Sequence, residues 1–170
     1  MTRIERCEHL KKFIEIRDDG LPYWLVTRNS QAIEGTVAGG LTSSGYRRVA
    51  VKVGKVNKEV MVHQLSFYIH AGYIPKIIDH INREPDDNRF CNLREVTMQQ
   101  NLMNRKFSKG SSEFKGVSFD KSKMKFKAQI NIKGKRTHLG YFKCEIEAAM
   151  AYDKAALKEF GEYAYLNFSV

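Results

Sequence analysis

The sequence has few of the residues that staple small proteins or anchor them in membranes. It holds three cysteines and three prolines in 170 residues. Cys7, Cys91 and Cys144 are far apart and odd in number, which excludes a disulfide framework and a Cys-x-x-Cys zinc site. No apolar run approaches the ~20 residues that span a bilayer, and the first residues lack the apolar core of a signal peptide. We therefore expect a protein of the reducing cytoplasm with no membrane partner.

The sequence also lacks the glycine-rich loops that bind nucleotide cofactors, so no small-molecule cofactor is expected. It has instead an excess of positive charge, with 29 Lys and Arg against 19 Asp and Glu, a net charge of +10. Residues 102–140 alone carry 11 basic and 2 acidic groups, a net charge of +9. A polyanion, first of all nucleic acid, is the partner that such a segment favours. From charge alone, a basic surface that only confers solubility stays open.

The pattern of apolar residues predicts an α+β protein made of two small modules. In the first module we expect a loop at 35–45 and a helix at 63–72 that ends near Gly72 and Pro75. Thr97 and Gln100 predict the start of another helix, which runs to about residue 105. Strands are expected at 23–27, 46–53, 56–62, 76–81 and 93–97. Residues 1–20 fit a helix or a strand equally well.

The second module follows a serine-rich stretch, and its pattern predicts a sheet that packs on one helix. Strands are expected at 115–119, 124–132 and 135–142, and a helix at 145–160 that ends at Gly161. Small residues such as Ala148 and Ala156 let this helix lie close on the sheet. The predicted division is a first module with its N-terminal β-rich region at 1–106, a linker at 107–112 and a sheet-plus-helix module at 113–170.

A cluster of polar residues in the first module points to metal-assisted chemistry. Asp79 and His80 lie on a predicted short strand, and Asn101 lies one turn into the next helix. A carboxylate and an amide oxygen are hard ligands that suit Mg²⁺, or Mn²⁺, with water and phosphate completing the shell. His80 is then available as a general base that activates water. On the Asp79-His80 dipeptide alone, a buried hydrogen-bonded pair is the better interpretation.

The wider pattern around this dipeptide resembles the HNH endonucleases, specifically the phage-type homing endonucleases. It comprises Val62-His63, Asp79-His80-Ile81-Asn82, Asn88-Arg89, Asn92-Leu93-Arg94 and Asn101. The resemblance implies a ββα-metal module in a phage-encoded protein of the bacterial cytoplasm. It implies that His80 is the general base, that Asp79 and Asn101 bind one divalent metal ion, and that Asn92 holds the loop through side-chain hydrogen bonds.

Three further polar residues of this module have weaker claims to a role in the site. Asn104 lies one turn beyond Asn101 on the same helix face and is the second choice for the amide ligand. For His63, at a strand–helix junction, a structural cap is favoured over catalysis. His70 is expected on the helix surface or in packing.

The second module has one strand whose side chains alternate with period two. Lys125, Lys127, Gln129 and Asn131 point one way, and apolar residues point the other way. If the last helix covers the apolar face, the cationic face is left open to a DNA groove, where Lys and Arg bind guanine edges or phosphates and amides pair with adenine. The alternative is a solvated polar face.

The same module resembles the APETALA-2/ethylene-response-factor type of DNA-binding domain over about residues 112–168. The motifs include Phe114-Lys115-Gly116-Val117, His138-Leu139-Gly140-Tyr141-Phe142 and Leu166-Asn167-Phe168. The resemblance implies groove binding through the sheet. The implied contact positions are Lys115, Gly116, Ser118, Asp120, Gln129, Asn131, Arg136 and His138. Ser118, Asp120 and His138 depart from the plant pattern, so the plant target sequence does not transfer.

Together these features predict a metal-dependent endonuclease that hydrolyses phosphodiester bonds at a specific site in double-stranded DNA, as homing endonucleases do. One site per chain fits a monomer that nicks one strand, and a concerted double-strand cut would need a dimer. A non-catalytic, sequence-specific DNA-binding regulator is the main alternative. A basic RNA- or ribosome-associated protein is the second.

Overall fold

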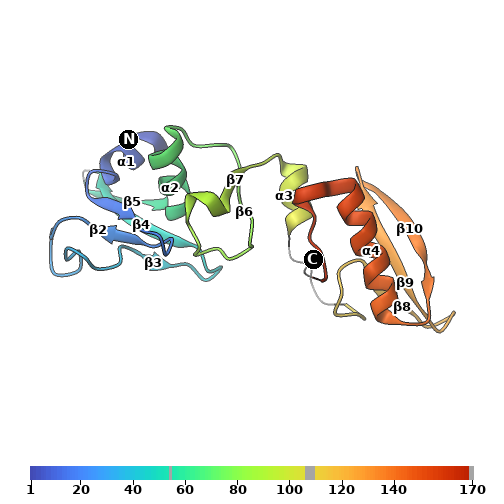
Figure 1. Cartoon of the computed structure of the whole chain (residues 1–170). Helices are drawn as coiled ribbons and strands as arrows, with labels where there is room; N and C mark the ends of the chain where they lie inside the picture. Colours follow the sequence, from blue (N-terminus) through green and yellow to red (C-terminus); the bar gives the residue numbers. More distant parts are fainter. Residues whose placement is uncertain (54, 106–109, 169–170) are drawn as a thin grey trace. The chain divides into compact units, whose positions relative to one another are not determined.

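A computed structural model describes residues 1–53, 55–105 and 110–168 (Figure 1). The chain packs as two compact units, Met1–Val96 and Thr97–Val170. Each unit combines helices with antiparallel strands, which confirms the α+β class. Among the described residues, no helix has the length and apolar character needed to cross a membrane.

The first unit contains three small antiparallel sheets and two helices. The sheets are ordered β1-β2, β3-β4-β5 and β6-β7. A 3-10 turn, η1 (Phe90–Asn92), precedes the last strand. The elements are α1 (Arg3–Leu10), β1 (Ile14–Ile16), β2 (Pro22–Trp24), β3 (Gly40–Leu41), β4 (Arg47–Val53), β5 (Val56–Met61), α2 (Val62–Ala71), β6 (Ile78–His80) and β7 (Leu93–Glu95).

The first residues, which the sequence left open, form a helix and then a strand. Thr2 and Glu5 make a capping box that fixes the start of α1. Cys7 and Leu10 of this helix are fully buried with Ile14, and they share one core with Val49 of β4 and Leu65 of α2. Burial raises the pKa of the Cys7 thiol to about 11, which makes it an inert core residue. The N-terminal segment is therefore an integral part of this unit.

The predicted loop at 35–45 contains a strand, so this prediction was wrong in part. Residues Gly40 and Leu41 form β3 and pair with Arg48 and Arg47 of β4. The backbone comes close because Gly39 has a φ of 77°, and a Cβ there would lie 2.2 Å from the Arg48 carbonyl oxygen. Glycine composition alone indicated a loop, whereas here it permits a close strand pairing.

The second unit is a three-stranded antiparallel sheet with one long helix on it, as predicted. Its elements are α3 (Met98–Asn104), β8 (Val117–Asp120), β9 (Lys125–Ile132), β10 (Lys135–Phe142), α4 (Glu145–Phe160) and the 3-10 turn η2 (Gly161–Tyr163). The sheet order is β10-β9-β8, and Figure 1 shows α4 lying across it. Ala148, Ala149 and Ala156 are fully buried. Gly116 lets β8 approach α4, because a Cβ there would lie 2.0 Å from the Tyr152 ring.

The serine-rich stretch before β8 is partly built into this unit. Of the predicted linker, residues 107–109 lie outside the described residues. Ser112 is buried and its hydroxyl accepts a hydrogen bond from the Phe114 amide at 3.0 Å. The Ser111 hydroxyl accepts one from the Phe119 amide, also at 3.0 Å. Both serines thus cap backbone groups of the folded unit, a role that serine composition does not distinguish from a linker.

Candidate functional site

Two short strands place the central pair of the first unit. Asp79 lies opposite Arg94, and His80 lies opposite Leu93, in the β6–β7 pair. Strict alternation in a strand would send Asp79 and His80 to opposite faces. The strand ends at His80, however, and both side chains are buried, with 7% and 6% of their surface exposed. The carboxylate and the imidazole are therefore both shielded from bulk water.

Arg94 is an ion-pair partner of the predicted metal-binding carboxylate. Its Nε donates to Oδ2 of Asp79 at 3.0 Å, and its Nη2 lies 2.9 Å from the same oxygen. Both side chains are nearly buried. A buried carboxylate needs such a partner, and this contact orients Asp79. No role was predicted for Arg94 from the sequence. Its position opposite Asp79 in two paired strands could have indicated that the two residues are in contact.

Asn92 holds together the loop between β6 and β7. Its Oδ1 accepts a hydrogen bond from the Asn82 amide at 3.0 Å. Its Nδ2 donates to the Asn82 side-chain oxygen and to the Asp87 carbonyl oxygen, both at 2.9 Å. Asn92 is buried, so these bonds replace water that the loop cannot reach. The contacts are of the kind that the resemblance implied for this residue.

Two acidic residues anchor the same loop. Arg47 of β4 makes a bidentate pair with Asp86, with distances of 2.8 and 2.7 Å. Asp87 accepts hydrogen bonds from Arg89 and Asn82. The bonds from Arg89 are the main reason that the pKa of Asp87 falls to about 2. Charge pairing thus fixes the loop that follows His80.

Two aromatic rings, those of Tyr46 and His63, pack against His80. The centroids of the His63 and His80 rings are 5.4 Å apart, and their planes are at 81°. Tyr46 lies edge-on to both, at 5.5 Å from His63 and 5.8 Å from His80. The predicted capping role of His63 was wrong, because the N-cap of α2 is Met61 and no side chain caps that end in the described unit. His63 instead packs against the predicted base.

Both imidazoles favour the neutral form. Burial lowers the pKa of His63 from 6.5 to about 4, and the charges of His80 and Arg3 act in the same direction. Burial also lowers the pKa of His80, although a hydrogen bond with Asn88 and the charge of Asp79 oppose this. A neutral imidazole is the form that can accept a proton from water. His70, at the other end of α2, stacks on Phe90 at 4.8 Å.

The donor set fits a hard divalent cation better than zinc. In the part of the chain that the structure describes, no three His, Cys, Asp or Glu side chains are grouped to hold a metal ion. A cation such as Mg²⁺ keeps several waters and needs only one or two carboxylates. Asp79 belongs to the first unit, whereas Asn101 and the buried Asn104 lie on α3 in the second. A metal ion shared by Asp79 and Asn101 therefore stays a prediction.

Six of the seven predicted DNA-contacting residues lie on one face of the second unit's sheet. Lys125, Lys127, Gln129 and Asn131 alternate along β9 with residues that face α4. In the register with β10, Asn131 lies opposite Arg136, and Gln129 lies opposite His138. Paired residues share a face, so basic and amide side chains form a continuous open surface. We call these six residues the basic face.

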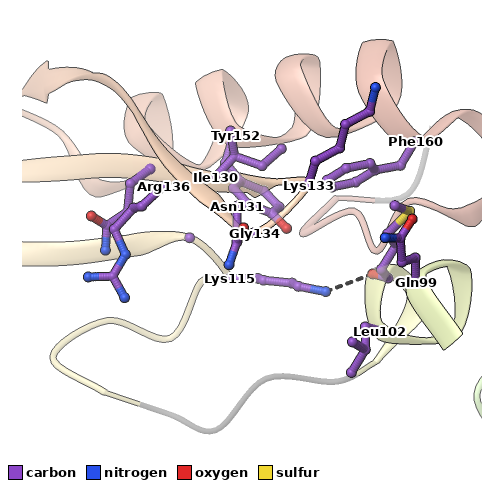
Figure 2. A pocket seen from close by; sticks show the side chains of 13 residues that line it. Gln99, Leu102, Lys115, Ile130, Asn131, Lys133, Gly134, Arg136, Tyr152 and Phe160 are labelled. Carbon is purple, nitrogen blue, oxygen red and sulfur yellow. Dashed lines mark hydrogen bonds between the residues drawn. The ribbon is translucent and has the colours of Figure 1, made fainter.

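Lys115, the seventh, has another role in the structure. Its Nζ donates to the carbonyl oxygens of Met103 and Arg105, both at 2.8 Å. These carbonyls are at the end of α3, and Figure 2 shows Lys115 reaching toward that helix. Its ammonium also lies 4.7 Å from the centroid of the Tyr165 ring. Lys115 thus ties α3 to the sheet module, although the sequence division placed this helix in the first module.

A cavity of about 590 Å³ opens between α3 and the sheet of the second unit (Figure 2). Gln99 of α3 lines one side, and Asn131 and Arg136 of the basic face line another. Ile130 and Phe160 give it an apolar wall. The residues that line the cavity include neither Asp79 nor His80, so it lies apart from the predicted catalytic residues.

Comparisons with known proteins find two family models that match parts of the chain. Residues 60–103 match the family described as HNH endonuclease, and residues 112–162 match the AP2 domain. An uncharacterized HNH endonuclease of Acanthamoeba polyphaga mimivirus is 30% identical over 129 residues, which are 75% of this chain and 65% of that protein. APETALA2-like protein 2 of Oryza sativa subsp. indica is 41% identical over 63 residues, 36% of this chain.

A solved structure of DNA binding and cleavage by the HNH homing endonuclease I-HmuI is also similar, with a TM-score of 0.41 and 26% identity. The match covers 56% of this chain and 54% of that chain. The chain thus spans only part of each similar protein, from 14% of the rice protein to 65% of the viral one. The first matched segment contains Asp79, His80 and Asn101, and the second contains the basic face.

Proposed function

We propose that this chain, in which residues 60–103 match an HNH endonuclease family and residues 112–162 match the AP2 domain, is a metal-dependent endonuclease that cuts double-stranded DNA at a specific site. The observation that carries the proposal is the buried Asp79–His80 pair, which ends strand β6 next to a loop held by Asn92 within the matched segment 60–103. A buried neutral imidazole beside an oriented carboxylate suits proton transfer next to a phosphate.

In the proposed reaction, His80 accepts the proton of a water molecule that attacks the scissile phosphorus in line. The bond from phosphorus to the 3′ oxygen breaks, and the released 3′ oxygen takes a proton from solvent, which leaves a 3′-hydroxyl and a 5′-phosphate. Arg94 keeps the Asp79 carboxylate in place through its contacts with Oδ2. The walls formed by Tyr46 and His63 keep His80 away from bulk water.

Asp79 and Asn101 would hold the divalent ion, Mg²⁺ or Mn²⁺. When bound, such an ion supplies positive charge that stabilises the phosphate as its negative charge increases. Asp79 is the anionic ligand, and Asn101 gives a neutral amide oxygen. Measuring metal affinity in Asn101→Ala tests the role of this amide oxygen. If the affinity is unchanged, Asn104 becomes the amide ligand to examine.

The basic face would position the enzyme on its target. Lys125, Lys127 and Arg136 carry charge for phosphates or guanine edges, while Gln129 and Asn131 can pair with adenine edges. Because α4 covers the opposite face of the three-stranded sheet, the basic face is free to contact a major groove. Selection of one site, as in a homing endonuclease, would come from these contacts. A monomer with one site would nick one strand, in the cytoplasm of a host cell.

A plasmid-nicking assay tests the proposed activity. Supercoiled DNA with Mg²⁺ should become open circles with the wild-type protein, and it should stay supercoiled with chelator or with His80→Ala. His70→Ala is the matched control, because this histidine stacks on Phe90 outside the site. Undiminished cleavage by His80→Ala contradicts the mechanism. Tight DNA binding without cleavage by the wild type would favour the non-catalytic regulator.

A further inference from the structure

The strongest unassigned feature of the first unit is the set of three rings formed by Tyr46, His63 and His80. Each pair among Tyr46, His63 and His80 is in edge-to-face contact, with centroid separations from 5.4 to 5.8 Å. Edge-to-face packing restricts how a ring can turn. His80 ends a strand of three residues, so its backbone alone does little to fix the imidazole. The neighbouring rings add to the restraint that the hydrogen bond with Asn88 gives.

His63 is held by the same ring contacts. Its Nδ1 is buried and has no hydrogen-bond partner among the described residues. His63 lies in the first turn of α2, and Val62 and Leu65 of this helix pack in the core of the unit. The ring therefore stands on a rigid element and touches His80 at 81°. A ring fixed on a helix and packed against the last residue of a short strand is an arrangement that can orient a catalytic group.

We propose that His63 is a positioning residue of the nuclease site, which holds the His80 imidazole in the orientation that proton transfer requires. The proposal rests on the proposed endonuclease function. The neutral state of His63 supports it, because a charge there would disfavour protonation of His80. His63 acts here through its ring and not through a proton of its own. A phenylalanine at position 63 should therefore keep the function, and an alanine should lose it.

A resonance measurement tests the positioning without relying on activity. In the metal-free full chain, the ¹³C–¹H ring signal of His80 should be a single sharp line in the wild type and in His63→Phe. In His63→Ala it should broaden or split, because the imidazole samples more than one orientation. His70→Ala changes the same residue type on the same helix and should leave the His80 line unchanged. An unchanged line in His63→Ala would overturn the proposal.

Single-turnover kinetics give the second readout. His63→Ala should lower the cleavage rate by roughly 10- to 100-fold, the cost of a misplaced catalytic group, while DNA affinity stays within about 2-fold of the wild type. His63→Phe should restore most of the rate. Equal losses in both variants would overturn the ring-contact role. If the wild type does not cleave, the proposed function fails, and the resonance result still decides whether His63 positions His80.

Discussion

At the scale of single residues, the candidate site consists of polar groups that are buried away from water. Asp79, His80, Asn88 and Asn92 are all buried within one small hairpin unit. Burial of polar groups costs free energy, so each needs a compensating contact. The contacts with Arg94 and Asn82 provide this for Asp79 and Asn92. Such a site is stable only when its hydrogen bonds are complete.

Acid should destabilise the first unit through His63. The folded pKa of this group is about 4, below its ordinary 6.5, so the unfolded chain binds more protons between these values. Stability is therefore complete above pH 6.5 and falls as the pH drops to 4, by roughly 3 kcal/mol at most. Urea unfolding across this window measures the loss. In His63→Phe the dependence should be smaller, and an identical slope in both proteins contradicts the assignment.

Asn92→Ala should destabilise the loop between β6 and β7. The change removes bonds to Asn82 and Asp87 and leaves buried backbone groups without partners. We expect a loss of about 2–3 kcal/mol in unfolding free energy. Asn57→Ala, at an exposed position of β5, should change stability by less than ~0.5 kcal/mol. Equal effects of the two changes would show that the loop does not depend on Asn92.

At the scale of elements, α3 is where sequence and structure differ most. The capping box of Thr97 and Gln100 was readable from the sequence and is present. The helix packs in the second unit, however, because Lys115 binds the carbonyls at its C-terminal end. A contact between a lysine and main-chain oxygens leaves no trace in a residue pattern. The helix that carries Asn101 is thereby attached to the module that carries the basic face.

Replacing Lys115 by methionine should loosen α3. The methionine keeps the apolar stem but removes the ammonium that caps Met103 and Arg105, a contact worth about 1 kcal/mol. Hydrogen exchange of the α3 amides should become faster. Lys125→Met removes the same charge from an exposed position of β9 and is the control. If α3 exchanges equally fast in both variants, Lys115 does not hold the helix.

The elements themselves were largely predictable, and the reason is periodicity. The strand at 135–142 and the helix at 145–160 were predicted with their observed bounds. The strand predicted at 124–132 is observed at Lys125–Ile132, where the side chains alternate, and small residues followed by Gly161 mark the helix. β3 was missed, since two residues are too few for a pattern. Asp79 and His80 were identified from the motif. The contacts of Asp79 with Arg94, and of His80 with Tyr46 and His63, could be seen only in the folded structure. Ring contacts between distant segments have no sequence period.

At the scale of the whole molecule, the positive charge is concentrated in one part of the sequence. The sequence around the nuclease loop, 61–100, has a net charge of −1, whereas 102–140 has a net charge of +9. A segment with that excess binds phosphates wherever they are, and its affinity depends on salt. We therefore expect the basic face to supply most of the DNA affinity, and the hairpin to supply the chemistry.

DNA affinity should fall steeply with salt. Contacts to about six to eight phosphates predict a slope of log K against log salt near −5 to −7, at roughly −0.9 per phosphate. Lys127→Ala should weaken binding and make the slope shallower by about 1, without changing metal affinity. Fluorescence anisotropy at several salt concentrations measures both. A slope shallower than about −2 in the wild type contradicts the basic face as the main binding surface.

Mapping the strand ends that the protein produces tests the central claim most directly. The wild type and His80→Ala are incubated with host or phage DNA and Mg²⁺, and the product ends are sequenced on both strands. The account predicts a discrete site with 5′-phosphate and 3′-hydroxyl ends for the wild type, and intact bound DNA for His80→Ala. Intact DNA with both proteins, or identical ends with both, would contradict it.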